Sequence, residues 1–468
     1  MRQKTQKPNI VVCMSDQLRP FELGCYGNSI VHTPHIDRLA AQGVRFDVAV
    51  SNNPVCMPAR SCLLSGQHSR TCIGGLGNDA VVDENGRSTM PEYPSPRRVS
   101  MFAPTLPEQL KKAGYRTAAI GKWHIQSAPN ALGFDHSVYP FVHHRHTNQT
   151  FIDHNGNTEI VAGYSVDHEL CAVESYFREC GEDGQPFFLY YNISPPHMPL
   201  ADAPERYLKM YDPDEVALRP NVFKDGRPAH NEEWFKIYLW DFLYYDLKQP
   251  HTLTLPDGFD IKQLTALYYG AISWVDDCVG RLRQSLKESG LDENTVIVFL
   301  ADHGDHLGSH HRFNKGTLLE EAIRIPLIFH APDKWAAAGN QSQVAQIIDV
   351  LPTLLDIAGA EIPDTAQGQS LRPILTGERQ SLNMNSAIIE TDGGSIGIRT
   401  LTHLYGMQLK NDLRTVEIER MCYYDLERDP YQWSNAAADG EPDGAELALR
   451  ETLLAWHRNT PWLDVLKS

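Results

Sequence analysis

The stretches NIVVCM at residues 9–14 and TVIVFL at residues 295–300 decide the fold. Both are almost continuously apolar, without the alternation of apolar and polar positions that a half-exposed strand shows. This pattern is typical of strands buried on both faces of a mainly parallel sheet. Ligands of open α/β sheets bind beyond the carboxyl ends of the strands, so we expect the polar residues that follow both stretches to lie together. These residues are Asp16, Gln17, Asp302 and His303.

Helical signals fall between the apolar stretches. An amphipathic run opens at Thr33 and stops at Gly43. Thr105 and Glu108 have the pattern of a capping box before a run that Gly114 closes. Two further helices are predicted at residues 262–289 and 349–358. Strands that alternate with helices predict an α/β fold in which helices cover both faces of a large, mainly parallel sheet.

The pattern changes after residues 375–377. Short strand-like stretches then follow one another, which predicts a small antiparallel sheet with one closing helix. The predicted strands are residues 387–390, 397–400, 404–409 and 422–426, and the predicted helix is residues 445–458. We therefore expect a large α/β domain at residues 1–380 and a small α+β subdomain at residues 381–468, joined near residues 376–386. Residues 201–260 show no sustained period, and we assign no element there.

The composition excludes some classes of protein. The 468 residues carry a net charge of −17, whereas a general nucleic-acid-binding protein needs a basic surface. The nine cysteines are odd in number and include no Cys-x-x-Cys pair, so we expect no disulfide framework and reduced thiols at all of these positions except Cys56. The length exceeds that of one ordinary domain, which fits two unequal domains.

The amino-terminal residues indicate a location. The first eight residues are polar and basic, and no apolar segment of a signal peptide follows them. The longest apolar run, residues 296–301, is far shorter than the roughly twenty residues of a membrane helix. The sequence as given therefore predicts a cytoplasmic protein without a membrane span. If a leader has been removed, we expect a periplasmic or secreted protein instead.

Two further motifs point to a family. The sequence CMPAR at residues 56–60 has the form Cys-x-Pro-x-Arg, and GKWH follows at residues 121–124. In this order and spacing, and together with the two strand-end motifs, these sequences resemble the formylglycine-dependent (type I) sulfatases of the alkaline phosphatase superfamily. The resemblance extends from Asn9 to about Asn435. It implies an alkaline phosphatase-like fold and the hydrolysis of sulfuric esters.

The resemblance implies a specific role for Cys56. In this family a maturation enzyme oxidises the cysteine to formylglycine, whose hydrate carries two hydroxyl groups on one carbon. One hydroxyl attacks the sulfur, and the other later expels the inorganic anion. Taken alone, Cys56 is more typical of a buried thiol without a chemical role. Pro58 can begin a helix through residues 59–64, and the positive end of that helix would face the site.

Three residues of these two motifs have implied catalytic roles. Arg60 orients the hydrate, Lys122 binds the hydrate and the anion, and His124 takes a proton when the anion is expelled. Lys122 and His124 follow an apolar strand at residues 117–120. Because alternate residues of an extended segment point the same way, both side chains are expected to reach one pocket. Without the other motifs, this pair would be typical of a solvated surface.

Two residues further along the chain match the remaining positions of the family's site. His197 lies in the sequence PPHMP after an apolar strand at residues 187–191. It matches a histidine that hydrogen-bonds the ester oxygen and can protonate the leaving alcohol. Lys315, in the sequence NKG, matches an anion-binding lysine. Its charge can neutralise the charge that grows on the transferred group.

A divalent metal ion is implied beside the cysteine. Two carboxylates, an amide and an imidazole at one sheet edge can hold such a cation, although either aspartate alone is more typical of a helix or turn cap. The implied ligands are Asp16, Gln17, Cys56, Asp302 and His303. The commonest sulfatase pattern has Asp-Asp and Asp-Asn at the strand ends and binds calcium, which prefers oxygen ligands. The imidazole of His303 departs from that pattern and makes manganese an alternative.

Other polar residues are weaker candidates. The histidine-rich residues 143–146 can line a substrate entrance, but their composition is more typical of a polar surface loop. Possible supports for the metal ligands are His306, His310 and His311. Further candidates for substrate contact are Asn78, Arg97 and Arg98.

The combined prediction is a sulfuric ester hydrolase that cleaves a sulfate monoester of a small molecule or a saccharide. A first alternative is a phosphonate monoester or phosphodiester hydrolase with the same machinery, because related phosphonate monoester hydrolases and choline sulfatases also carry Asp-His at the second strand end. A second alternative is an inactive homologue that binds anions or glycans, against which Cys56 and Lys122 both argue. The expected protein partner is the formylglycine-generating maturation enzyme, and the sequence predicts no oligomeric state.

Overall fold

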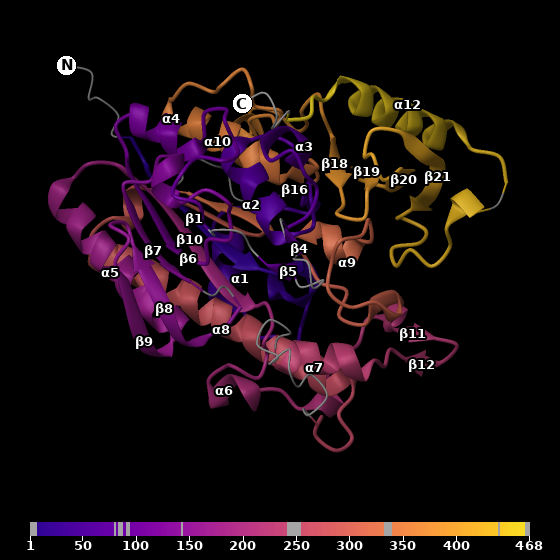
Figure 1. Cartoon of the computed structure of the whole chain (residues 1–468), viewed down its shortest axis with the longest axis horizontal. Coiled ribbons are helices and arrows are strands. Elements are labelled where there is room, and N and C mark those ends of the chain that lie inside the picture. The colour runs from indigo at the N-terminus through magenta and orange to yellow at the C-terminus, as the bar shows by residue number, and fades with distance from the viewer. Residues whose placement is uncertain are drawn as a thin grey trace.

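The computed structural model of the chain contains a ten-stranded sheet in the order β16-β2-β15-β13-β1-β10-β6-β7-β8-β9 (Figure 1). Its five central strands run parallel, which confirms the predicted α/β class. They are β13 (Thr295–Ala301), β1 (Asn9–Asp16), β10 (Phe187–Pro196), β6 (Arg116–Gly121) and β7 (His136–Pro140). The structure describes residues 7–78, 81–82, 88–89, 94–141, 144–240, 254–331, 339–438 and 440–463.

Antiparallel strands extend both sides of the parallel centre. On one side lie β15 (Leu327–His330), β2 (Val44–Phe46) and β16 (Gly339–Gln341), of which β16 runs parallel to β2. On the other side lie β8 (Thr147–Asp153) and β9 (Thr158–Tyr164). Neither β8 nor β9 was predicted, because β9 is largely exposed and lacks the apolar run that marks the central strands.

Helices cover both faces of the sheet, which explains why the central strands are continuously apolar. On one face α5 and α8 pack against β10 and against each other, with α1 beside them. On the other face α2, α4 and α10 pack together, with α4 against β6. The six helices are α1 (Pro34–Ala41), α2 (Cys56–Ser65), α4 (Leu106–Lys112), α5 (Ser165–Asp183), α8 (Ile261–Glu288) and α10 (Val350–Ala358). The predicted helices near residues 34, 106, 262 and 350 are confirmed, as is the capping box of Thr105 and Glu108.

Residues 201–260 contain short elements that sequence periodicity did not predict. One of them, α7 (Glu232–Trp240), is fixed by a tertiary contact, because its Tyr238 donates a hydrogen bond to the Asp305 carboxylate at 2.6 Å. The described part of this segment, which excludes residues 241–253, includes α6 (Glu205–Leu208), β11 (Phe223–Lys224), β12 (Arg227–Pro228) and α7 (Glu232–Trp240). Other short elements are β3 (Ala49–Val50), α3 (Ser69–Cys72), β4 (Val81–Val82), β5 (Ser88–Thr89), α9 (Glu320–Ile323), β14 (Arg324–Ile325), β17 (Ala345–Gln346) and α11 (Arg372–Leu375).

A separate four-stranded antiparallel sheet follows near the carboxyl end, at the upper right of Figure 1. Its elements are β18 (Ser386–Glu390), β19 (Ser395–Thr400), β20 (His403–Leu409), β21 (Val416–Asp425) and the covering helix α12 (Gly444–Asn459). The predicted small sheet and its closing helix are confirmed, although β21 begins well before residue 422. The division of the chain at residue 380 stays a prediction.

The register of the central strands aligns their carboxyl ends. Ser15 of β1 pairs with Ala301 of β13, and Asp16 pairs with Pro196 of β10. The residues that follow these strands therefore meet at one edge of the sheet. All nine cysteines lie in the described part of the chain, and none of them forms a disulfide there. Among the described helices, none combines the length and apolar character that crossing a bilayer requires.

Candidate active site

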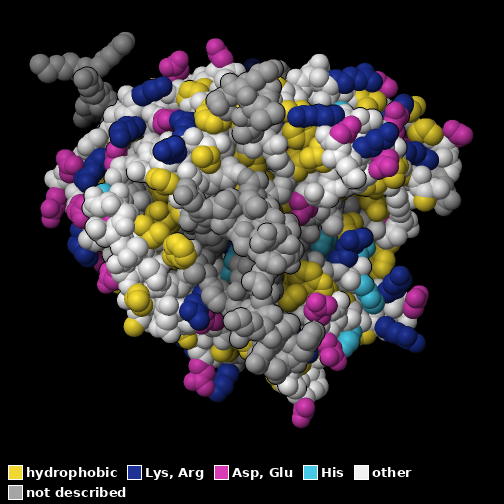
Figure 2. All heavy atoms as spheres, in the orientation of Figure 1, with side chains coloured by type: hydrophobic (Ala, Val, Ile, Leu, Met, Phe, Trp, Pro, Cys, Tyr) yellow, Lys and Arg dark blue, Asp and Glu magenta, His cyan; other side chains and the backbone are white. Residues whose placement is uncertain are grey.

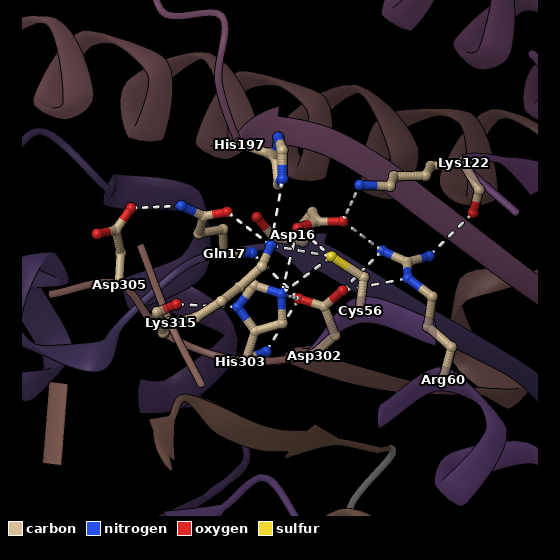
Figure 3. Close-up of polar contacts among 12 residues, drawn as sticks. Asp16, Gln17, Cys56, Arg60, Lys122, His197, Asp302, His303, Asp305 and Lys315 are labelled. Atoms are coloured by element: carbon tan, nitrogen blue, oxygen red, sulfur yellow. Dashed lines mark hydrogen bonds and ion pairs between the residues drawn. The ribbon is translucent and has the colours of Figure 1, made fainter. Parts of the chain in front are cut away.

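Cys56 lies at the centre of a buried polar cluster at this sheet edge (Figure 3). Only 1% of its surface is exposed. Its Sγ lies 3.2 Å from His303 Nε2 and accepts a hydrogen bond from Lys315 Nζ at 3.0 Å. The side chain of His124 also hydrogen-bonds to it. The motif cysteine is thus surrounded by groups from several distant segments of the chain.

Cys56 is the first residue of α2, so the helix begins earlier than the predicted start at Pro58. Val55 adopts an extended conformation before it, and its carbonyl accepts the first helical hydrogen bond from Ala59. Pro58 lies within the first turn, where backbone N–H groups have no helical acceptor, so proline removes no helical hydrogen bond there. The positive end of the helix consequently lies at Cys56 itself.

Two aspartates beside Cys56 are held by Arg60. Its Nη2 lies 3.0 Å from Asp16 Oδ2 and 3.0 Å from Asp302 Oδ2, and all three side chains are fully buried. Its Nη1 donates to the carbonyl oxygen of Lys122 at 2.9 Å and to Asn192 Oδ1 at 3.0 Å. Removing one partner of such a buried ion pair typically costs about 3–5 kcal/mol of stability. Arg60 therefore fixes the two carboxylates, while its predicted role in orienting the hydrate stays a prediction.

The donor set around Cys56 fits a divalent cation. One ligand atom each from Asp16, Cys56, Asp302 and His303 lies within 4.8 Å of all the others. His303 Nδ1 lies 2.9 Å from the carbonyl oxygen of Gly304 and can donate a hydrogen bond to it. This leaves the Nε2 lone pair directed toward the cluster, 3.7 Å from Asp16 and 3.6 Å from Asp302. A neutral imidazole held in this tautomer is the form that binds metals.

Gln17 completes the cluster with its amide group. Its backbone lies in the left-handed region, with φ at 63°, and its N–H donates to Asp302 Oδ1 at 3.0 Å. Its side-chain Nε2 donates to Asp305, so Oε1 faces Lys315 Nζ at 3.0 Å. Sequence analysis did not identify Asp305, although its place three residues after Asp302 offered a signal.

Lys122 and His124 both reach the site, but not as alternate residues of a strand. β6 ends at Gly121, whose φ of 90° and whose close approach to the Asn192 carbonyl admit only glycine. His124 also has a positive φ, at 46°. Two turns of the backbone, instead of strand alternation, therefore bring the Lys122 ammonium to Asp16 and the His124 imidazole to Cys56.

His197 and Lys315 lie on the opposite side of Cys56 from Arg60 (Figure 3). His197 Nε2 is 3.2 Å from Lys315 Nζ, and its Nδ1 is 2.8 Å from the Met198 carbonyl oxygen. Burial and the charges of Lys122 and Lys315 lower the pKa of His197 to about 3, so the ring is neutral at physiological pH. Nε2 is then the position that can exchange a proton with a neighbouring group.

Two histidines that were expected on a surface loop are instead buried behind His197. His144 Nδ1 lies 3.2 Å from His197 Nδ1, and the two rings stack with centroids 4.3 Å apart. His146 Nε2 lies 3.1 Å from the His197 carbonyl oxygen. Only 8% of His144 and 2% of His146 is exposed. The prediction of a surface loop was wrong for these two residues because each imidazole has polar partners inside the protein. His143 lies outside the described residues.

The remaining candidates have other contacts. Asn78 Oδ1 accepts from the backbone N–H of Met57 at 3.1 Å, next to the cysteine. Arg98 pairs with Glu108 at 2.6 Å, and Arg97 is exposed. The three histidines after the second motif contact Thr317, Asn221 and the Arg227 carbonyl oxygen instead of the metal-ligand cluster; they are His306, His310 and His311.

The charged residues of the cluster favour ionisation of the Cys56 side chain. Burial alone would raise the pKa of the Cys56 thiol, but Lys315 and Lys122 lower it well below its usual range. Burial also opposes ionisation of Asp16, yet Lys122 and Arg60 hold its pKa far below the usual value. The site therefore stabilises negative charge at Cys56, as a site for an anionic ester requires.

Comparison with models of known families identifies the family of this chain. The family model described as Sulfatase matches residues 8–360. The chain belongs to the sulfatase family. A second model, described as N-sulphoglucosamine sulphohydrolase, C-terminal, matches residues 308–459 of this sulfatase. The predicted family is therefore confirmed, and the protein is a sulfuric ester hydrolase.

Individual relatives of this sulfatase resemble it over nearly its whole length. An N-acetylglucosamine-6-O-sulfatase of Bacteroides thetaiotaomicron is 26% identical over 97% of this chain and 86% of its own. A solved protein in complex with its substrate D-glucosamine-2-N,6-O-disulfate superimposes with a TM-score of 0.77, 25% identity and coverage of 97% and 98% of the two chains. A phosphonate monoester hydrolase of Agrobacterium radiobacter shares the fold, with a TM-score of 0.71, 22% identity and coverage of 97% and 96%.

Proposed function

We propose that this sulfatase hydrolyses a sulfate monoester with formylglycine, derived from Cys56, as its nucleophile and with one divalent metal ion. The observation that supports this most is the position of Cys56. It lies within hydrogen-bonding distance of Lys315 and beside the carboxylates that Arg60 holds. A catalytically silent thiol would not need such a concentration of buried charge.

The ligands proposed for the metal are Asp16, Gln17, Asp302, His303 and the modified Cys56. Their oxygen atoms favour calcium, whereas the imidazole makes manganese the alternative. When bound, the ion supplies positive charge that lowers the pKa of a formylglycine hydroxyl and polarises the ester. Arg60 keeps both carboxylates in position for it, and the Gly304 carbonyl keeps His303 in the required tautomer.

The residues around the nucleophile have separate roles in the proposed reaction. Formylglycine hydrate supplies one hydroxyl that attacks sulfur and a second that expels the sulfate. Lys122 and Lys315 neutralise the charge on the transferred group, from opposite sides of Cys56. His124 hydrogen-bonds to the Cys56 side chain and is placed to take the proton of the second hydroxyl. The Lys315 ammonium lies 3.2 Å from His197 Nε2 and can supply the proton that this nitrogen passes to the leaving oxygen.

The modification itself is tested by the mass of the peptide that contains Cys56. The protein should be produced with a formylglycine-generating maturation enzyme, and the peptide should show the loss of sulfur that conversion to the aldehyde causes. A matched sample made without that enzyme should retain the cysteine mass and lack turnover. Full turnover with unmodified Cys56 would contradict the proposed nucleophile.

The proposed substrate is a saccharide sulfate. A related protein is named for N-acetylglucosamine 6-O-sulfate, and a similar solved structure holds a glucosamine disulfate. Both support a sugar alcohol as the leaving group in this protein.

A phosphonate or phosphate diester hydrolase remains the second candidate function, because His303 occupies the position at which related phosphonate hydrolases carry histidine. We expect kcat/KM to be higher for an aryl sulfate than for the matching phosphonate monoester with the same leaving group. Both esters carry a single negative charge, which the pocket formed by Lys122, Lys315 and His197 suits, so the ratio of the two kcat/KM values decides between them. A preference for the phosphorus ester above about tenfold, equivalent to about 1.4 kcal/mol of transition-state binding, would replace the sulfatase reaction as the main activity.

His197→Ala should harm substrates with poor leaving groups most. An alcohol of high pKa needs a proton as it departs, whereas an activated phenol does not. We expect the variant to lose about 10²-fold or more in kcat on an alkyl or sugar sulfate, and much less on 4-nitrophenyl sulfate. Equal losses on both classes would show that His197 positions the anion instead. Stacking on His144 makes a fold check by thermal unfolding necessary.

A further inference from the structure

A cavity of about 290 Å³ lies next to the nucleophile site, beside the β11–β12 hairpin. Lys315 connects the two places, since its side chain lines this cavity and its Nζ contacts Cys56 Sγ at 3.0 Å. Trp234 and the stacked ring of Phe313 supply apolar surface, and Asn231 adds a polar amide. The mixed lining is suited to the ring and hydroxyl groups of a sugar.

The lining of this cavity is unusually cationic for an acidic protein. It includes the cations Lys315 and Arg312 and two histidines but, among the described residues, no aspartate or glutamate. The chain as a whole carries 59 acidic residues and a net charge of −17. Figure 2 shows histidine, Lys and Arg side chains on this face, below the carboxyl-terminal sheet, with Asp and Glu side chains among them. A cavity whose described lining has no carboxylate side chain, in a protein of net negative charge, is suited to an anionic ligand.

Arg312 is the arginine of this cavity. Its side chain is exposed, and no ion pair links it to any residue in the described part of the chain. The same residue lines a second cavity of about 520 Å³ along β19 and β21, which is likewise without an aspartate or glutamate in its described lining. Arg312 thus stands where both cavities meet.

The spacing of Arg312 and Lys315 matches a substrate with two negative groups. They are three positions apart in the chain, so their Cα atoms lie within about 11 Å of each other. One sugar residue with its substituents can bridge that distance. An arginine at the far end can bind a sulfate or carboxylate through two hydrogen bonds.

We propose that Arg312 is a specificity residue that binds a second anionic group on the saccharide whose sulfate ester lies at Cys56. This inference rests on the proposed function and narrows its substrate class to saccharides that carry a further sulfate or carboxylate. The sugar ring would lie in the cavity lined by Trp234, and its second anionic group would contact the guanidinium.

The proposal can be tested by binding, without turnover, in the Cys56→Ala background. The probes are D-glucosamine-2-N,6-O-disulfate and N-acetylglucosamine 6-sulfate, which share a ring and one ester but differ in one negative charge. Titration calorimetry should show the disulfate binding about tenfold more tightly. Arg312→Ala should remove that difference, and Arg312→Lys should restore part of it, because lysine keeps the charge without the planar fork.

The matched control is Arg178→Ala, which removes an exposed arginine from α5 without touching either cavity. It should preserve the difference between the probes. Equal affinity of the two probes, no binding of the disulfate, or the same loss for both probes in Arg312→Ala would each refute the proposal. If wild-type enzyme hydrolyses aryl sulfates while the difference is absent, only this inference fails. If the difference is present but aryl and sugar sulfates are not hydrolysed, the proposed function fails instead.

Discussion

Replacing Cys56 with alanine is expected to lower kcat by at least about 10³-fold, because the variant loses the nucleophile that covalent catalysis needs. The residue stands at the first position of α2, and its side chain contacts Lys315 and His303. Alanine can adopt the same helical backbone conformation, so the fold should persist. Steady-state kinetics with 4-nitrophenyl sulfate and a thermal unfolding curve measure the two effects.

Cys180→Ala is a matched control for that experiment. This cysteine is equally buried, on α5, but burial raises the pKa of its thiol to about 11, and it is therefore protonated at neutral pH. Its replacement should leave turnover near the wild-type value. Near-normal turnover of the Cys56 variant would show that the nucleophile lies elsewhere.

Removal of the divalent metal is expected to abolish turnover, and addition of calcium or manganese should restore it. Asp302→Ala should lower metal content and affinity by at least about 10- to 100-fold, since its carboxylate is one of the oxygen donors beside Cys56. The side chain is also an ion-pair partner of Arg60, so Asp302→Asn should accompany it as the less disruptive change. Elemental analysis of the purified proteins reports metal content independently of activity.

Asp276→Asn offers the control for metal content. Asp276 belongs to a second cluster of possible ligands, with His35 and Asp277. Its carboxylate, however, accepts hydrogen bonds from the backbone N–H groups of His35 and Ile36 at the start of α1. We expect this variant to bind as much metal as the wild type. A fully active wild-type sample without metal would eliminate the proposed centre.

Some features of the site follow from the sequence because they are local. The two apolar strands place Asp16 and Asp302 at the sheet edge, since parallel strands end together once both faces are covered. The Cys-x-Pro-x-Arg motif likewise fixes Cys56 and Arg60 in one short helix. Each of these predictions needs only a stretch of neighbouring residues and the pattern of their side chains.

Contacts between distant segments were decided by the tertiary structure. Gln17 and Asp305 are 288 positions apart, and His144 and His197 are 53 positions apart, yet each pair is in direct contact. The backbone turns at Gly121 and His124 also depend on packing, because the Asn192 carbonyl presses against Gly121. Residues in these contacts share no periodic pattern.

The sequence by itself determined the fold class and the family and predicted the central residues of the site, because strand burial and the family motifs are encoded in short, continuous stretches. The tertiary structure alone decided the orientation of Gln17 by Asp305, the burial of His144 and the exposure of Arg312 between two cavities. The physical reason is that hydrogen bonds, burial and cavities belong to groups that meet in space after folding, and their strength depends on which distant neighbours exclude water from them.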